Sequence, residues 1–393
     1  MDQAPLPLPP VPTRAAGLQR LAQFLPRADL AYAARRNEDL PGHPHVSGLS
    51  PWIRHRLVTE AEVITAVRAA HPQGAEKFLA EVWWRTYWKG WLEMRPQVWA
   101  DYAAGVMAAQ NRLAVEGGLR AVWQDACAGS TGIDGFDHWA RELVSTGWLH
   151  NHARMWFASI WIFTLRLPWE LGADFFLRHL MDGDAASNTL SWRWVAGLHT
   201  PGKTYLATAE NIAKNTGGRF RPKGLAAVAE PLRIAGHPAP RPAPVGEDWA
   251  DVPSLLLLHE DDLDATWIAP LLSVAGLAAL TATAGRSPGV VAAGVTEFVA
   301  GAVADALARH GDAQAPVFDR EGLEALADHA GRLGVRQVVT PHAPVGPVAS
   351  TLRKLRPLLL ARGITLVQAL SRHDREAWPH ATHGFFRFRE AVM

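Results

Sequence analysis

The segment DGDAASNTLSWRW, residues 182–194, decides the fold, since it packs two carboxylates, an amide and two tryptophans into a short stretch. Upstream, STGWLHNHARM (145–155) has a chain-breaking glycine before a helix that places Asn151, Arg154 and Met155 on one side. Asp182 and Asp184 with Arg154 can form a buried charge cluster. Such a cluster is costly unless its charges are paired, so it serves either a ligand or a structural bridge.

A third segment, FLAEVWWRTYW (78–88), places Glu81, Trp84 and Arg85 three and four residues apart, on one face of a helix. A carboxylate, a flat aromatic ring and a guanidinium group could together hold a planar polar ligand. The alternative, which spacing alone favours, is a helix that buries Trp84 and exposes an ion pair.

The hydrophobic pattern divides the chain into two domains. Residues 14–235 show helical spacing and almost no strand-like alternation, whereas 1–13 suggest an extended arm. The run 236–253 holds five prolines and predicts a linker. In 254–393, strand candidates at 254–259, 335–340 and 364–370 alternate with helix candidates at 295–311, 320–334 and 351–363. The predicted fold class is therefore a mainly α-helical domain followed by a smaller α/β domain with an open parallel sheet.

Composition narrows the class of protein. The 393 residues carry a net charge of +1, so a nucleic-acid site must be a local patch. Cys127 is the single cysteine, which excludes an internal disulfide and fits the reducing cytoplasm. No run of about 18 apolar residues predicts a membrane span, and His150 and His152 are spaced for different helix faces, which argues against a metal. Of the 17 tryptophans, most precede residue 195, which suits either a large core or a site that stacks rings.

Together, these segments resemble the FAD-binding catalytic region of the photolyase/cryptochrome family. STGWLHNHARM, LPWELGADFF (167–176) and DGDAASNTLSWRW match its central signature without gaps, and FLAEVWWRTYW resembles its Glu-x-x-Trp-Arg helix. AYAARRN (31–37) and VSGLSPWI (46–53) resemble its phosphate-binding stretch. The resemblance covers about residues 14–220, in the right order.

The resemblance implies FAD as the cofactor and assigns residues to it. The implied cofactor contacts are Tyr32, Ser47, Leu49, Ser50, Arg85, Asn151, Arg154, Asp182, Asp184 and Asn188. Among these, Arg154 and Asp182 match an ion pair beside the isoalloxazine ring, and Asn188 matches the residue that faces flavin N5. A second, antenna chromophore stays unidentified.

The family also implies DNA carrying a flipped-out pyrimidine dimer as the partner. The implied substrate contacts are Arg36, Glu81, Trp84, Asn151, Met155 and Trp194, with no metal and no membrane involved. Glu81, Asn188, Trp192 and Trp169 are the implied catalytic residues, the two tryptophans as members of an electron chain. We thus expect a cytoplasmic blue-light DNA repair enzyme, a deoxyribodipyrimidine photolyase (a carbon–carbon lyase) that splits cyclobutane pyrimidine dimers by electron transfer from reduced FAD. A cryptochrome-like photoreceptor without repair activity is the alternative.

Departures from the family pattern are informative. Val46 replaces a threonine and His152 replaces a substrate-side arginine, while the third tryptophan of the chain is missing around Arg112 and Leu113. Trp99 and Trp123 are candidate substitutes. The family places an α/β antenna domain before the flavin domain. Here the α/β domain follows, and its ending resembles part of an antenna domain, permuted or substituted.

Overall fold

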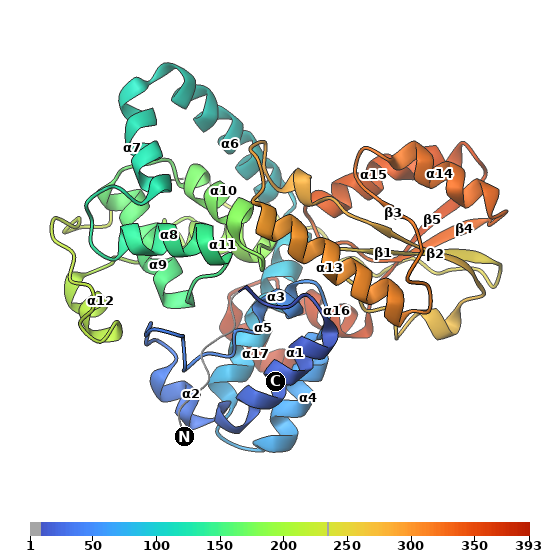
Figure 1. The fold of residues 1–393 in the computed structure, drawn as a ribbon, viewed down its shortest axis with the longest axis horizontal. Helices are drawn as coiled ribbons and strands as arrows, with labels where there is room; N and C mark the ends of the chain where they lie inside the picture. The colour runs from blue at the N-terminus through green and yellow to red at the C-terminus, as the bar shows by residue number, and fades with distance from the viewer. Residues whose placement is uncertain (1–8, 234–235) are drawn as a thin grey trace.

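The computed structural model describes residues 9–233 and 236–393. Its first part is a helical domain that ends with α12, and its second part contains a parallel sheet (Figure 1). The extended arm predicted for 1–13 lies mostly outside the described residues, as do the last two residues of the predicted 14–235 domain. In residues 9–13, Val11 accepts a 2.9 Å hydrogen bond from the Trp52 indole.

The helical domain is built from twelve helices in the described residues. They are α1 (Arg14–Phe24), α2 (Leu30–Arg35), α3 (Ser50–Arg54), α4 (Glu60–Ala70), α5 (Glu76–Glu93), α6 (Gln97–Val115), α7 (Gly117–Ala128), α8 (Phe136–Thr146), α9 (Asn151–Ser159), α10 (Trp169–His179), α11 (Ala185–Val195) and α12 (Ala209–Asn215). Short turns join some of them, a 3-10 turn at Leu25–Arg27 and a π-helical turn at Ile160–Thr164.

Local sequence signals set several helix ends. Thr59 and Glu62 form a reciprocal capping box that starts α4. Gly147 ends α8 in the left-handed region at φ 68°, which glycine adopts without steric cost. Asp184 caps α11 by accepting a hydrogen bond from the Ser187 amide. The Gly147 turn and the Asp184 cap therefore place the 145–155 and 182–194 segments at neighbouring helix ends.

The second part of the chain contains a five-stranded parallel sheet in the order β3-β2-β1-β4-β5. The strands are β1 (Ser254–His259), β2 (Val274–Leu280), β3 (Val317–Phe318), β4 (Gln337–Pro341) and β5 (Thr365–Ala369). The helices α13 (Ala293–Arg309), α14 (Leu323–Arg332) and α15 (Pro347–Leu360) cover it. Alternate β1 side chains face opposite layers, with Leu255 and Leu257 toward α14 and α15, and Leu256 and Leu258 toward α13. The predicted fold class is confirmed.

The chain then returns to the helical domain. After β5, α16 (Arg372–Ala377) and α17 (Phe385–Val392) pack on α5, as Figure 1 shows. The approach is close, because a Cβ added to Gly90 of α5 would lie 2.8 Å from the Trp378 ring. The sheet therefore ends at β5, and the last part of the predicted 254–393 domain completes the surface of α5.

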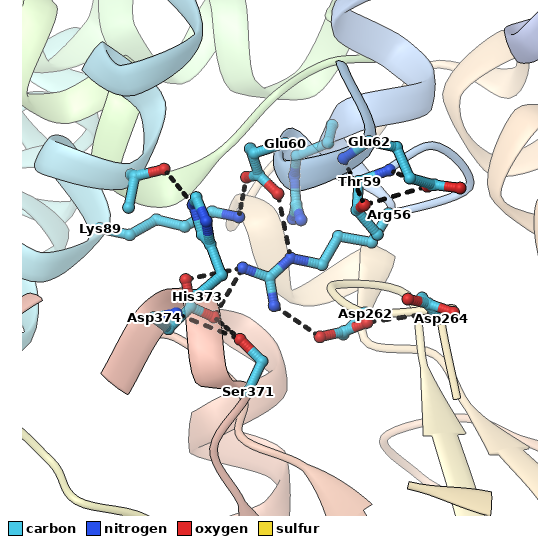
Figure 2. A network of polar contacts seen from close by, with 12 residues as sticks. Arg56, Thr59, Glu60, Glu62, Lys89, Asp262, Asp264, Ser371, His373 and Asp374 are labelled. Carbon is cyan, nitrogen blue, oxygen red and sulfur yellow. Dashed lines mark hydrogen bonds and ion pairs between the residues drawn. The ribbon is translucent and has the colours of Figure 1, made fainter. Parts of the chain in front are cut away.

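A buried polar network joins the two domains (Figure 2). Arg56 donates to Asp262 at 2.7 Å and to Asp374 at 2.6 and 2.8 Å, and lies 3.3 Å from Glu60. Lys89 lies 3.5 Å from the other oxygen of Glu60. Every member is buried, so removing one partner would leave uncompensated charge. One hydrophobic core also runs across the junction, from α1, α4 and α5 to the sheet and α17.

Candidate functional site

The charge cluster predicted from the sequence forms in part: Arg154 of α9 pairs with Asp182, which precedes α11, whereas the cation nearest Asp184 is Arg54. Arg154 donates to both oxygens of Asp182, at 3.1 and 2.8 Å, and its Nε donates to the Leu149 carbonyl. The Asp182 side chain is 2% exposed and that of Arg154 is 24% exposed. Burial opposes ionisation of Asp182, but Arg154 outweighs it and holds the pKa of this carboxyl below its usual value. The pair presents a fixed carboxylate–guanidinium edge.

Asp184 is a second ionised carboxylate in the same loop. It accepts a 2.7 Å hydrogen bond from the Ser187 amide and lies 4.0 Å from Arg54. Burial raises its pKa, but Arg54, Lys89 and Arg85 lower it more, to about 2. Arg54 also donates to the Gly183 carbonyl at 2.7 Å and to Asp261 at 2.6 Å. The loop is therefore held from the sheet domain as well, a contribution that no motif in the sequence indicates.

Arg85 tests whether this site fits a polar cofactor. Its Nη1 is buried and has no hydrogen-bond partner among the described residues, although its charge acts on both Asp182 and Asp184. A buried guanidinium N–H without a partner is costly and is normally satisfied by an acceptor. The Ser187 hydroxyl is buried and unpartnered too. Donors left free beside two fixed carboxylates fit a ligand rich in acceptors and N–H groups, as FAD is.

Asn188 lies one helical turn after Asp184 and is 8% exposed. Its Nδ2 donates to the Ala173 carbonyl of α10 at 2.8 Å, which holds the amide in one orientation. The contact ties α11 to the helix that carries Trp169.

The predicted phosphate-binding residues are only partly brought together. Ser47, Leu49 and Ser50 form one turn, and the Trp148 indole donates to the Ser50 hydroxyl at 3.2 Å. The Ser50 hydroxyl also interacts with Asp182, which links this turn to the charge cluster. Tyr32 instead packs edge-on against Phe78, with ring centroids 5.1 Å apart. Burial raises the pKa of the Tyr32 hydroxyl, which remains protonated.

The predicted substrate residues keep exposed surface. Arg36 and Glu81 form an ion pair whose side chains are 29% and 32% exposed. Burial raises the pKa of Glu81, while Arg36 opposes this rise. Trp84, one turn along α5, is half-buried and stacks on Phe385 of α17.

The other substrate residues lie on α9 and α11. Asn151 is exposed, and Met155 and Trp194 are half-buried. His152 connects the groups, since Nδ1 lies 3.1 Å from the Asn37 carbonyl and Nε2 lies 3.0 Å from the Tyr205 hydroxyl, whose ring packs against Trp194. Burial lowers the pKa of His152, so it is neutral and fully engaged. His152 therefore connects the backbone at Asn37, next to Arg36, with the Tyr205 ring that packs against Trp194.

The two predicted electron-chain tryptophans lie in the α10–α11 layer. Trp192 is 2% exposed, and its ring lies against Gly172, where a Cβ would approach within 2.3 Å. Trp169, on the same helix as Gly172, has the Arg193 guanidinium 5.9 Å from its ring centroid. The ring centroid of Trp169 also lies 5.7 Å from that of Tyr102, which lies 5.1 Å from that of Trp99. Tyr102 was not predicted, although its position three residues after Trp99 on a helix puts the two rings on one face.

The comparisons with known proteins agree with this geometry. Residues 78–222 match the family model for the FAD binding domain of DNA photolyase. Over these residues the helical domain is similar to the photolyase/cryptochrome family. The predicted family and its cofactor, FAD, are confirmed.

The photolyase relatives match only part of their length. The deoxyribodipyrimidine photo-lyase of Streptomyces griseus is 36% identical over 165 residues, which cover 42% of this chain and 34% of that protein. The one from Thermus thermophilus is 31% identical over 225 residues, covering 56% and 50%. A class III photolyase structure from Agrobacterium tumefaciens is 25% identical with a TM-score of 0.44, covering 52% of this chain and 43% of that one. The chain thus spans a third to a half of the length of these relatives.

Neither a metal-binding cluster nor a membrane-spanning helix is present in the described residues. Within residues 9–233 and 236–393, no cluster of three or more His, Cys, Asp or Glu side chains is arranged to hold a metal ion. Over the same ranges, no helix combines the length and hydrophobicity needed to cross a bilayer.

Proposed function

We propose that the protein is a blue-light-dependent deoxyribodipyrimidine photolyase that splits cyclobutane pyrimidine dimers in DNA. The observation that carries the proposal is the convergence of Arg154, Asp182, Asp184 and Arg85 at one place, with buried donors left free. FAD, when bound and excited by light in its reduced form, supplies the electron that opens the dimer.

The protein's own residues bind and orient. The Arg154–Asp182 pair and Asp184 hold fixed charges at one edge of the site, and Asn188 is kept in one rotamer by Ala173. Preorganised charges of this kind need no rearrangement during the reaction. Burial raises the pKa of Glu81, which favours the protonated carboxyl that can donate to a pyrimidine carbonyl, while Arg36 opposes the rise.

The lesion-binding role is supported by exposure. Arg36, Glu81, Trp84, Asn151, Met155 and Trp194 all retain accessible surface, whereas Trp192 and Asp182 are buried. A pyrimidine dimer flipped out of the duplex needs aromatic rings that stack on its bases and polar groups that reach the base edges. Asn151 and Met155, where histidines accompany (6–4) repair in the family, favour pyrimidine dimers. We place the protein in the cytoplasm, where the half-buried Cys127 stays reduced.

The test is direct repair. Purified protein is mixed with a thymine-dimer oligonucleotide under blue light, and the absorbance at about 260 nm is followed as the thymine rings are restored. Recovery in light and not in darkness supports the proposal. No recovery by flavin-loaded, reduced protein contradicts it.

A cryptochrome-like photoreceptor without repair activity is the second candidate. The observation in its favour is His152, which is neutral and already bonded to Asn37 and Tyr205, so it cannot serve as a cationic phosphate contact. This candidate predicts equal affinity for damaged and undamaged DNA.

A further inference from the structure

An open cavity of about 830 Å³ lies beside Trp169. Arg112 of α6 lines it. The family resemblance leaves the third electron-chain tryptophan missing in the region around Arg112 and Leu113. Phe163 of the π-helical turn and Leu198 add apolar wall. Trp169, the second tryptophan of the predicted chain, therefore borders this cavity with the 6% of its surface that is exposed.

The cavity wall contains a π-helical turn, a residue with left-handed backbone and a segment fixed by hydrogen bonds. The segment 225–233 is pinned on both sides, because the Ala226 amide donates to the Thr164 hydroxyl and the Leu232 amide donates to the Ala196 carbonyl. Arg166 has φ 55°, in the left-handed region that a non-glycine residue seldom occupies. A π-helical turn and a strained residue in one cavity wall are both features that concentrate at functional sites.

Three guanidinium groups and two carboxylates line the cavity. Arg112, which also pairs with Glu116, lies there with Arg166 and Arg233, against Glu170 and Glu230. Arg166 is exposed and, within the described residues, takes part in no ion pair or side-chain hydrogen bond, so its guanidinium group is available to an anion. Guanidinium groups bind phosphate through paired N–H donors, and the exposed part of Trp169 borders the same cavity.

We propose that this cavity binds a reduced nicotinamide nucleotide, which returns an electron to oxidised Trp169. The inference rests on the proposed light-driven function. One electron passes from the dihydronicotinamide ring to the tryptophan radical cation, which becomes neutral tryptophan. The donor loses a proton to water and leaves as the neutral nicotinamide radical. The cavity thus replaces the missing tryptophan, since a soluble donor reaches Trp169 directly.

Two donors with the same dihydronicotinamide ring test the proposal on the flavin-loaded protein. Reduced nicotinamide mononucleotide carries a phosphate, and 1-benzyl-1,4-dihydronicotinamide carries none. Dark binding is measured from the fluorescence of the donor, and photoreduction is measured against donor concentration. We expect the phosphate-bearing donor to bind about tenfold more tightly or better, because a charge-assisted contact is worth about 1.5–3 kcal/mol. Equal binding of the two donors would overturn the proposal.

Matched variants identify the residues. Arg166→Asn removes a charge but tolerates left-handed backbone, and Arg112→Gln removes another. Each should weaken dark binding of the phosphate donor about five- to tenfold and leave the benzyl donor unchanged. Arg372→Gln is the control, because Arg372 pairs with Glu376 as Arg112 pairs with Glu116, four residues apart on an exposed helix. Loss of affinity in Arg372→Gln, or none in the two cavity variants, contradicts the assignment.

A rival path runs from Trp169 through Tyr102 to Trp99. If that path carries the electron, Trp99→Phe slows photoreduction with both donors, and the cavity proposal is wrong. We expect Trp99→Phe to change neither rate. If the wild type shows no photoreduction with any donor, the proposed function fails, while the dark-binding comparison still decides whether the cavity binds the nucleotide.

Discussion

The ring of Phe385 lies flat on the ring of Trp84, with centroids 3.7 Å apart and planes 10° apart. Phe385 belongs to α17 and Trp84 to α5, so the stack joins the end of the described chain to a predicted lesion-binding residue. One face of Trp84 is therefore occupied by the protein, and DNA can use only what remains of the ring.

Paired substitutions separate the two roles of this stack. Trp84→Ala should weaken binding to dimer-containing DNA about tenfold, since stacking on a base is worth about 1–3 kcal/mol. Phe385→Leu should lower the melting temperature and leave that affinity nearly unchanged. Affinities for damaged and undamaged oligonucleotides, with flavin content alongside, are the measurements. Equal loss of affinity for both DNAs in Trp84→Ala would show that the ring is only structural.

Asp182→Asn should release most of the bound FAD. The change leaves Arg154 without its bidentate partner, and breaking a buried pair costs about 3–5 kcal/mol, with the partial exposure of Arg154 favouring the lower end. Heat-released cofactor is identified and quantified by chromatography. Glu116→Gln, which breaks an exposed pair on α6, is the control and should keep full FAD. Retention of FAD and stability by Asp182→Asn would contradict the site.

Trp192→Phe should abolish photoreduction with an external reductant while FAD stays bound. The reason is that Trp192 is the predicted donor closest to the flavin, and phenylalanine is not oxidised in its place. Trp123, a candidate third member by sequence, lies on α7, outside the α10–α11 layer, so Trp123→Phe should photoreduce normally and photoreduction lost in it would restore that candidate. Photoreduction that persists in Trp192→Phe points to another aromatic path, such as Trp161, whose ring lies 6.2 Å away.

Arg56→Ala should destabilise both domains together. The three carboxylates Glu60, Asp262 and Asp374 would lose their shared cation in a buried setting, at a cost of about 3–5 kcal/mol. Calorimetry should show one transition at lower temperature. Arg356→Ala, which removes an exposed pair with Glu247, should shift stability by about 0.5 kcal/mol or less. A normal melting temperature in Arg56→Ala would mean that the network contributes little.

His43 should make stability fall as the solution becomes basic. Burial disfavours its charge, but Asp39 and Glu142, at 3.2 and 2.9 Å, raise its pKa to about 9. A histidine whose pKa is raised on folding stabilises most below its unfolded pKa of about 6.5, and this contribution is lost as pH rises through 9. His43→Asn, which also tolerates the φ of 47°, should remove the pH dependence. Parallel melting curves for both proteins between pH 6.5 and pH 9 would contradict this.

Much of the fold follows from periodicity alone. The apolar run at 254–259 forms β1 within the predicted bounds, and the candidates at 335–340 and 364–370 became β4 and β5. Strand β2 was missed because VAGLAAL is built from small residues with little strand preference, and β3 is only two residues long.

Side-chain chemistry was predictable where spacing fixes it. Asp182, Asp184 and Arg154 were predicted to form one cluster, and the structure bears out the Arg154–Asp182 pair, while Asp184 lies beside Arg54. Two contacts could not be predicted from the sequence, because each joins distant segments that no periodicity relates. They are the contact of Arg54 with Asp261, 207 residues away, and the stack of Trp84 on Phe385.

The return of α16 and α17 to α5 also governs how the protein is made. Residues 372–392 pack against Trp83, Tyr87 and Gly90 of α5. Because these residues lie almost 300 positions after α5, the helix leaves the ribosome long before the segment that covers it is synthesised. Contacts of such long sequence separation slow folding and leave apolar surface open meanwhile. Until the sheet and the last helices have been translated, the aromatic face of α5 stays exposed. We expect chaperones to bind the nascent helical domain during that interval.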